Sequence, residues 1–502
     1  MCGISGFTWK DEDLIARMNQ ALQHRGPDDQ SVYVDHRVTL GHRRLSIIDL
    51  SPAGRQPTCN EDGSIWIVFN GEIYNFQELR SDLEKCGHIF TSNTDTEVII
   101  HAYEEWGEGC VERFNGMWAF AIYDKGKGIL FLSRDRFGVK PLYFSQQDGG
   151  MIFSSEIRAI LQHMRVRAPD DRTVYDFLIS GFLDHTPQTF FSGIERLMPG
   201  ESMIYDLSRR EGSRIRWYDL DERLKVRLKE GRAGPGGRRA GVEMDGGADE
   251  SESAKGILEL FMDSVRYRLI SDVPVGSCLS GGIDSSAIVY AMRRLNRSAI
   301  IKTFSMVFPG KKEDESCYIE AVVSDTDTSA HYVSPTPDDL RRDLFDLIRT
   351  QEEPFASLSI YGQYKVMEMA HRSGMKVLLD GQGSDEIFAG YFIYYKYYLF
   401  ESLLRLCPGE AAAAAKRIKN KLNDLLLFPA MTVLSRLGLS SGPLQRLWLS
   451  RRAYLKGYEG VSLSNPLLDR GFDLNRALRS DLLRFSIPQL LRYEDKNSMR
   501  WS

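Results

Sequence analysis

The sequence lacks the features that mark secreted, membrane-spanning and disulfide-rich proteins. No apolar run approaches the ~18 residues that a membrane-spanning helix needs, and the start shows no basic stretch followed by an apolar one. The seven cysteines are scattered, and none forms a C-x-x-C pair. We therefore expect no membrane span, no signal peptide, no disulfide framework and no zinc site. These absences favour an enzyme of the cytoplasm.

A large excess of charge of one sign is also missing. Lysine and arginine number 64 against 69 aspartates and glutamates, a net charge of -5. A general nucleic-acid-binding protein shows a marked basic excess, so nucleic acid is not an expected partner. With 502 residues, of which 42% are hydrophobic, the chain is long enough for two or three globular domains.

A Gly-rich segment with almost no large apolar residues divides the chain. Residues 229–250 hold seven glycines. Such a composition buries too little apolar surface to offset its ordering entropy, so we expect a linker or surface insertion there. The prediction is a first domain at 1–210, a linker at 211–254 and a second domain at 255–502.

The two parts differ in the spacing of their apolar residues. The first holds several short runs rich in β-branched and aromatic residues, such as 118–124, and few helical stretches. This pattern predicts an α+β sandwich of antiparallel sheets. In the second part, strand-like runs at 273–279, 301–308 and 375–380 alternate with helical ones. Alternation is typical of an α/β domain with a doubly wound parallel sheet, and further helices are expected beyond Tyr391.

A cysteine directly follows the initiating methionine. Removal of Met1 would leave Cys2 with a thiol and a free α-amino group on one residue. An α-amino group titrates near pH ~8, close enough to neutrality to act as the base for its own thiol. A frayed, tolerant N-terminus is the other interpretation, and the opening residues alone do not choose between the two.

Two polar clusters follow predicted strands of the second part. S-G-G-I-D-S-S at 280–286 leads into a predicted helix, where small residues and free N–H groups suit a pyrophosphate, although this is no Walker A loop. L-L-D-G-Q-G-S-D-E at 378–386 lies at the edge where open α/β sheets place ligands. Asp284 and Asp385 are suited to hold Mg²⁺ together. The alternatives are a Gly-rich helix cap and a polar turn.

Taken in order, these motifs resemble those of the glutamine-dependent asparagine synthetases, and the similarity extends over almost the whole chain. The resemblance implies an amidotransferase domain of the N-terminal-nucleophile type, with a cysteine nucleophile, joined to an AMP-forming synthetase domain with a pyrophosphate loop. The motifs that carry it are M-C-G-I-x-G at the start, H-R-G-P-D (24–28), R-L-S-I-I-D (44–49), F-N-G-E-I-Y-N (69–75), T-D-T-E (94–97), F-N-G-M-W-A-F (114–120), R-D-R-F-G-V-K-P-L-Y (134–143), S-S-E-I-R-A (154–159) and S-G-G-I-D-S-S (280–286).

In the first domain the resemblance implies a glutaminase site. Cys2 would attack the side-chain amide of glutamine, form a γ-glutamyl thioester and release ammonia. The side-chain amide of Asn70 and the backbone N–H of Gly71 would form the oxyanion hole. The implied glutamine-binding set contains an arginine for the α-carboxylate, two acids for the α-amino group, and their neighbours: Arg44, Leu45, Ser46, Ile47, Ile48, Asn70, Gly71, Glu72 and Asp95.

In the second domain the resemblance implies an ATP site that activates a carboxylate as an acyl-adenylate, which ammonia then attacks. For aspartate the products are asparagine, AMP and pyrophosphate. Mg²⁺ would bridge Asp284, Asp385 and the pyrophosphate, and the family carries ammonia between its two sites through an internal tunnel. The implied ATP-binding residues are Leu279, Ser280, Gly281, Gly282, Asp284, Ser285, Ser286, Met306, Asp380 and Gly381.

The sequence departs from the family at two places. Gln382 replaces a glutamate that takes part in intermediate formation and removes a proton from the attacking ammonia, and a glutamine cannot take up a proton in that role. Asp380, two residues away, is the residue that we expect to compensate. Residues 490–502 stop inside a motif that the family continues, so we expect a fragment or a synthetase domain truncated at its C-terminus.

These observations predict a glutamine-hydrolysing asparagine synthetase that uses ATP and Mg²⁺, with glutamine and aspartate as substrates. Two alternatives stay open. One is a relative that amidates another carboxylate, on a sugar or a secondary metabolite. The other is a truncated relative with glutaminase or binding activity alone. We expect no membrane partner, and the oligomeric state, with a homodimer as one candidate, is not given by the sequence.

Overall fold

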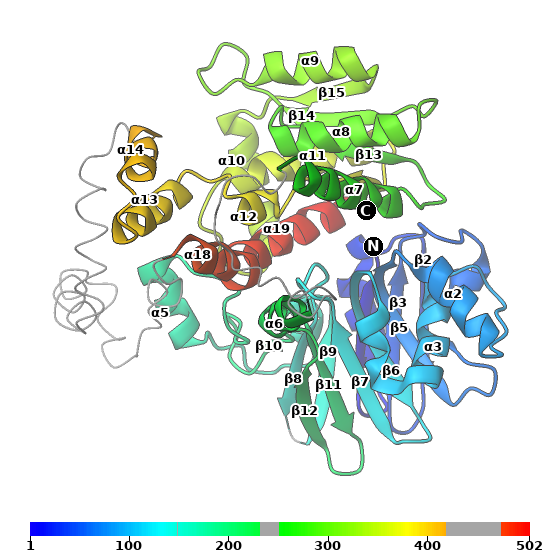
Figure 1. Ribbon diagram of the computed structural model, residues 1–502. Helices are drawn as coiled ribbons and strands as arrows, with labels where there is room; N and C mark the ends of the chain where they lie inside the picture. The colour runs from blue at the N-terminus through cyan, green and yellow to red at the C-terminus, as the bar shows by residue number, and fades with distance from the viewer. Residues whose placement is uncertain (148, 231–249, 418–472) are drawn as a thin grey trace.

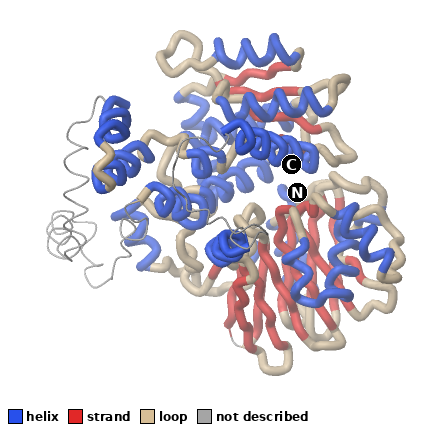
Figure 2. Tube along the Cα trace, in the orientation of Figure 1, coloured by secondary structure: helices blue, strands red, loops and turns tan. Residues whose placement is uncertain are grey.

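The computed structural model describes residues 1–147, 149–230, 250–417 and 473–502. Most of the Gly-rich segment predicted to be a linker, 231–249, lies outside the described residues. The described chain forms two parts that lie side by side, one dominated by strands and one in which strands and helices alternate (Figure 1 and Figure 2). Among the described residues, no helix is both long enough and apolar enough to span a bilayer.

The N-terminal part contains two six-stranded sheets in which neighbouring strands are antiparallel. The predicted sandwich of antiparallel sheets is therefore confirmed. The first sheet, in spatial order, consists of β10 (Glu195–Arg196), β8 (Tyr143–Gln147), β9 (Gly150–Ser154), β1 (Gly3–Phe7), β3 (Thr39–Arg44) and β2 (Asp29–Val34). The second consists of β12 (Glu211–Arg216), β11 (Glu201–Asp206), β7 (Ile129–Arg134), β6 (Gly116–Asp124), β5 (Ile65–Ile73) and β4 (Thr58–Cys59).

The two sheets enclose a core because alternate residues of each strand point to the same face. Ile4 and Phe153 of the first sheet pack in one cluster with Val68, Ala121 and Leu132 of the second, and all five are buried. Helices cover the outer faces: α1 (Glu12–Ala21) and α4 (Ile157–Ile160) on the first sheet, and α2 (Phe76–Lys85) and α3 (Asp95–Trp106) on the second. The part also contains α5 (Asp171–Ser180), α6 (Leu220–Glu230) and the 3-10 turns Gln23–Arg25, Pro52–Gly54 and Gly107–Arg113.

The C-terminal part is built on a four-stranded sheet in which all pairs are parallel. Helices pack on both faces, since Val289 of α8 joins one hydrophobic cluster and Val366 of α11 joins another on the opposite side of the strands. The prediction of a parallel sheet flanked by helices is confirmed. Its elements are α7 (Glu250–Arg268), β13 (Val275–Cys278), α8 (Ile283–Leu295), β14 (Lys302–Met306), α9 (Ser316–Thr326), β15 (Ser329–Val333), α10 (Pro337–Gln351), α11 (Ser359–Arg372) and β16 (Val377–Leu379).

The described chain after β16 is mostly helical, as expected beyond Tyr391. Residues 418–472, which were included in that expectation, lie outside the described residues. The second N-terminal sheet runs on to Arg216, and α7 begins at Glu250, so regular structure occupies both ends of the range predicted as a linker. The remaining helices are α12 (Ser384–Phe388), α13 (Tyr394–Leu404), α14 (Pro408–Arg417), α18 (Leu474–Ser480), a π-helical turn (Asp481–Phe485) and α19 (Ile487–Arg500).

Helix α19 lies between the two parts and binds them through buried charges (Figure 1). Asp495 accepts hydrogen bonds from both terminal nitrogens of Arg25, at 2.8 and 3.0 Å, and from Lys140 Nζ at 3.1 Å. Arg25 Nε in turn donates to the carbonyl of Cys2 at 3.1 Å. Through Arg25, these hydrogen bonds connect the first residues of the chain to α19.

Candidate active sites

A pocket at the start of β1 collects the residues expected to bind glutamine. Cys2 lies directly before β1, and its Sγ is 3.8 Å from the carbonyl oxygen of Leu45. Ser46 and Asn70 do not line the pocket, and the Ser46 N–H donates to Asp28 Oδ2 at 2.8 Å. Met1 lines the pocket beside Cys2. The expected residues that do line it are Cys2, Arg44, Leu45, Ile47, Ile48, Gly71, Glu72 and Asp95.

Asn70 has a fully buried side chain whose Nδ2 and Oδ1 find no hydrogen-bond partner among the described residues. Leaving buried polar atoms unpaired typically costs ~1–3 kcal/mol, so a ligand that accepts from Nδ2 would recover that cost. At the next position, a Cβ on Gly71 would lie 2.1 Å from the Met117 carbonyl oxygen. Only glycine fits there, and its backbone stays close to the pocket. Asn70 Nδ2 and the Gly71 N–H are the kind of donors that an oxyanion hole requires.

Arg44 is held in place by the turn that follows β3. Its Nη1 donates to the Ser51 carbonyl at 2.8 Å, and its Nη2 donates to the Asp49 carbonyl. A Cβ on Gly54 would lie 2.0 Å from Arg44 Nη2, so that glycine makes room for the guanidinium. A guanidinium has five N–H donors, which leaves donors for a carboxylate.

Two carboxylates in the pocket are buried close together. Burial, helped by the charge of Asp95, raises the pKa of Glu72 to about 7. Burial raises the pKa of Asp95 to about 6, although the Ile73 N–H donates to its Oδ2 at 2.9 Å. A cation placed between two buried acids stabilises their ionised forms. The α-amino group of glutamine is such a cation.

His24 and His42, which lie near pocket residues in the sequence, do not supply a base for the Cys2 thiol. Burial lowers the pKa of His42 to about 3, and its Nε2 lies 3.2 Å from the Phe69 carbonyl. His24 Nε2 is 3.0 Å from both carboxylate oxygens of Glu156. Burial raises the pKa of the Cys2 thiol, so the thiol needs a base, and the α-amino group on the same residue remains the one expected to act.

The loop between β13 and α8 has the form of an anion cradle. α8 begins at Ile283, and no side chain caps its first turn, so its first N–H groups are open to an anion. The loop closes on itself, since the Ser280 N–H donates to Ser285 Oγ at 3.1 Å and Ser286 Oγ donates to the Gly282 carbonyl at 2.7 Å. Gly281 has a φ of +85°, a conformation that favours glycine.

Asp284 and Asp385 come together from different helices. Asp284 lies in the first turn of α8 and Asp385 in the first turn of α12. Ser384 Oγ donates to Asp284 Oδ1 at 2.8 Å, and burial together with the Asp284 charge raises the pKa of Asp385. A Cβ on Gly381 would lie 3.2 Å from the Asp284 Cβ, so the two loops pack tightly. Paired carboxylates that form no ion pair within the described residues are ligands suited to Mg²⁺.

The remaining residues of the expected ATP site have different surroundings. Leu279 is 1% exposed, and its carbonyl accepts from Ser305 Oγ at 2.6 Å. Met306 ends β14 and packs against α11, where a Cβ on Gly362 would lie 2.5 Å from its sulfur. Asp380 follows β16. Its Oδ1 accepts from the Gly381 N–H at 2.7 Å, and burial raises its pKa.

Glu494 on α19 is a site residue that the sequence did not reveal. Its Oε2 is buried and has no hydrogen-bond partner within the described residues. Burial and the charge of Asp380 raise the pKa of Glu494 well above the ordinary value, while Lys140 acts in the opposite direction. No local sequence motif indicates this acid, because it lies on a helix far along the chain from Gln382.

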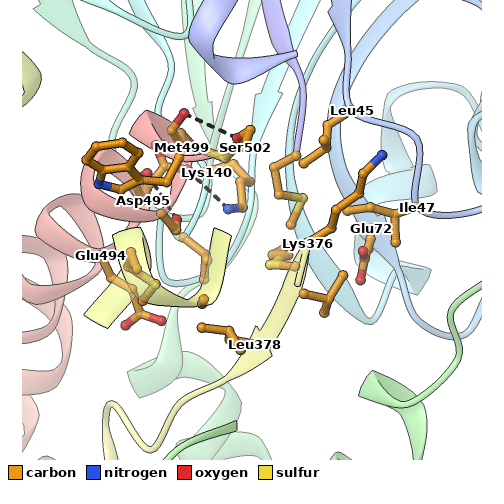
Figure 3. A pocket seen from close by; sticks show the side chains of 18 of the residues that line it. Leu45, Ile47, Glu72, Lys140, Lys376, Leu378, Glu494, Asp495, Met499 and Ser502 are labelled. Atoms are coloured by element: carbon orange, nitrogen blue, oxygen red, sulfur yellow. Dashed lines mark hydrogen bonds and ion pairs between the residues drawn. The ribbon is translucent and has the colours of Figure 1, made fainter. Parts of the chain in front are cut away.

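A cavity of about 150 Å³ lies between the two parts of the molecule (Figure 3). Glu72 and Lys140 line it from the N-terminal part, and Leu378 and Glu494 line it from the C-terminal part. The cavity adjoins the glutamine pocket, because both are lined by Met1, Leu45, Ile47 and Glu72.

The two parts match two known domain families. Residues 1–218 match the glutamine amidotransferase domain, and residues 256–502 match asparagine synthase. The fold and the two sites therefore define a glutamine-dependent carbon–nitrogen ligase class. Within that class, the chain belongs to the glutamine-hydrolysing asparagine synthetase family.

Three relatives illustrate this membership. A protein of Methanocaldococcus jannaschii that carries the name of a glutamine-hydrolysing asparagine synthetase is 35% identical, over 85% of this chain and 82% of that protein. Asparagine synthetase 3 of Bacillus subtilis is 32% identical over 78% of this chain and 63% of its own length. Amidase chry2 of Gibberella zeae is 30% identical over 78% of this chain and 59% of its own length. The chain thus spans about three fifths of the last two relatives.

Proposed function

We propose that the chain makes asparagine from aspartate, ATP and ammonia that it releases from glutamine. The observation that supports this most strongly is that the pocket containing Cys2 adjoins a cavity whose lining includes Glu494. A glutaminase alone needs no such cavity, whereas a ligase that uses ammonia from glutamine does.

The glutaminase step uses groups that meet in the first pocket. After Met1 is removed, the α-amino group of Cys2 takes the thiol proton, and the sulfur attacks the amide carbon of glutamine. The oxyanion that forms accepts hydrogen bonds from Asn70 Nδ2 and the Gly71 N–H. The proton passes to the amide nitrogen, the C–N bond breaks, ammonia leaves, and water then hydrolyses the thioester. Removal of Met1 also clears part of both the pocket and the cavity.

The cavity keeps the released ammonia out of bulk water. Ammonia is protonated in water near neutral pH and would lose its nucleophilic lone pair. Much of the wall is apolar, with Leu45 and Ile47 on one side and Met375 and Leu378 on the other. The apolar part of the wall favours the neutral molecule.

The synthetase step begins at the loop after β13. The N–H groups of the loop and of the first turn of α8 would bind the phosphates of ATP, and Asp284 and Asp385 would hold Mg²⁺. The ion would neutralise charge on the departing pyrophosphate. The acceptor carboxylate attacks the α-phosphorus of ATP, a P–O bond to pyrophosphate breaks, and an acyl-adenylate forms.

Ammonia then forms a C–N bond to the acyl carbon, AMP leaves with the electrons of the C–O bond, and the nitrogen must lose a proton. Gln382 cannot accept that proton. Glu494 is an acid on the cavity wall with an unpaired oxygen, so we assign the proton to Glu494 Oε2. Asp380, which the sequence suggested for this role, already accepts a hydrogen bond from the Gly381 N–H and acts beside Glu494.

The second candidate function changes only the acceptor. Gln382 replaces the family glutamate at this site, and a relative that shares 30% identity carries the name of an amidase. A carboxylate on another small molecule is therefore the alternative to aspartate.

Glutamine labelled with ¹⁵N in its side-chain amide tests the proposal when it is supplied with ATP, Mg²⁺ and aspartate. We expect label in asparagine, together with one AMP for each asparagine. The Cys2→Ala variant should form no labelled asparagine, yet should still make asparagine from ammonium chloride. Labelled ammonia without asparagine would reject aspartate as the acceptor, and release of neither product would reject both half-reactions.

A further inference from the structure

Two histidines and a glutamate gather on the outer side of the second sheet, away from both active sites. His88 lies in the loop between α2 and α3, and His101 and Glu104 lie one turn apart on α3. His88 Nδ1 is 3.1 Å from His101 Nδ1, and His101 Nδ1 is 2.9 Å from Glu104 Oε2. The third edge of the triangle, from His88 Nδ1 to Glu104 Oε2, is 3.8 Å. We propose that these three side chains bind a zinc ion.

The triangle has the dimensions of a tetrahedral zinc site. Its edges of 3.1, 2.9 and 3.8 Å average close to the roughly 3.3 Å that separates two ligand atoms of tetrahedral zinc. They place the three atoms about 1.9 Å from a common centre, so an ion slightly above their plane reaches the roughly 2.0–2.1 Å of a zinc–nitrogen bond. A fourth position, on the open side of the triangle, is then available to water.

The other polar atom of each ligand faces a group that orients it. His88 Nε2 lies 3.3 Å from Glu105 Oε2, and His101 Nε2 lies 3.8 Å from a carboxylate oxygen of Glu97. Glu104 Oε1 accepts from the Asn60 side-chain amide at 2.8 Å, which leaves Oε2 for a metal. Histidine ligands of zinc commonly donate their second ring N–H to a carboxylate, as His88 can to Glu105.

A bound cation also accounts for the close approach of the three donor atoms. When each histidine is neutral and carries its proton on Nε2, both Nδ1 atoms present lone pairs. Those two lone pairs and the Glu104 carboxylate oxygen then face one another within 3.8 Å. Three electron-rich atoms at such distances repel unless a positive charge lies between them. A zinc ion supplies that charge and satisfies all three.

Burial fits a site that an ion can enter. The His101 side chain is 2% exposed, whereas those of His88 and Glu104 are 17% and 22% exposed. The ion would join α3, the loop before it and the turn that holds Asn60. Asp95, which begins α3, lines the glutamine pocket. The site would therefore fix the helix that carries one of the two acids expected to bind glutamine, without taking part in its chemistry.

Cobalt(II) tests the site, because it replaces zinc and absorbs visible light strongly when its coordination is tetrahedral. The full-length Cys2→Ala protein is freed of metal with a chelator and titrated with Co²⁺ in excess Mg²⁺, so that neither the thiol nor the paired aspartates contribute. We expect one equivalent of tetrahedral Co²⁺, displaced by Zn²⁺. His88→Ala and Glu104→Gln should abolish the signal. His36→Ala, which removes an exposed histidine outside the triangle, should retain it.

Glu105→Gln provides a variant that keeps all three donors. Loss of an orienting carboxylate typically weakens metal binding ~10–100-fold, so we expect the zinc dissociation constant, measured by chelator competition, to rise by at least ~10-fold. Binding of less than ~0.1 equivalent to the wild-type triangle, or a cobalt spectrum that survives in His88→Ala with native circular dichroism, would overturn the proposal.

Discussion

Replacing Glu494 by glutamine removes the proposed proton acceptor while preserving the size of the side chain. A positioned general base contributes ~10²–10⁴-fold to a rate, which corresponds to about 3–5 kcal/mol at ~1.36 kcal/mol for each factor of ten. Asp380 lies close enough for its charge to raise the pKa of Glu494 and can take over part of the role. We therefore expect the lower end of that range, a ~100-fold slower formation of asparagine from ammonium chloride in Glu494→Gln.

The partial reactions separate this role from others. Formation of the adenylate, followed as pyrophosphate release, should change by less than ~3-fold in Glu494→Gln, because the acid acts after that step. Hydroxylamine loses its proton more readily than ammonia once it has attacked, so the variant should form the hydroxamate at nearly the wild-type rate. The matched double variant Gln382→Glu/Glu494→Gln restores an acid at the family position and should recover asparagine synthesis. Equal losses with ammonia and hydroxylamine, without recovery in the double variant, would refute the assignment.

Three further outcomes are expected. Asn70→Ala should lower glutamine hydrolysis by ~10²–10³-fold and leave synthesis from ammonium chloride within a factor of ~3; equal losses in both assays would contradict an oxyanion role. Glu72 and Asp95, with pKa values of about 7 and about 6, must be ionised to bind an ammonium group. The KM for glutamine should therefore rise as pH falls from 8 to 5, and a flat profile would argue against that binding mode. Asp495→Asn leaves the buried Arg25 with Glu156 as its remaining partner, so urea unfolding should show a loss of ~3 kcal/mol; an unchanged midpoint would mean that this ion pair does not stabilise the fold.

Local features of the sequence predicted which segments meet at the two candidate sites. The change from strand to helix around 280–286 is visible in consecutive residues, and so is Asp284 within it. The motif around Arg44 was less informative about orientation. Ser46 was expected to bind glutamine, yet Leu45 and Ile47 line the pocket and Ser46 does not. The Ser46 N–H instead donates to Asp28, a contact that the local sequence does not reveal.

Glu494 and the histidine cluster could not be read from the sequence for a different reason. Gln382 showed that the family's proton acceptor was missing. The acid close to Asp380 is Glu494, which lies on α19, and only the tertiary packing of that helix brings it there. Likewise, the search for metal ligands began from cysteine spacing, and the donors found here are histidines separated by a loop and a helix. His88 and His101 approach one another only because α2 and α3 pack on the same sheet.

The charged groups that join α19 to the N-terminal part affect whether the two parts can be separated or exchanged. Asp495 is compensated by Arg25 and Lys140, and Lys496 by Glu352 and Glu156, all of them buried. Separating the two halves would leave the Asp495 carboxylate without Arg25 and Lys140, and would leave Lys496 with Glu352 alone. Exchange of the glutaminase module between relatives therefore requires that Arg25 and Lys140 travel together with a partner helix that still carries the matching acid.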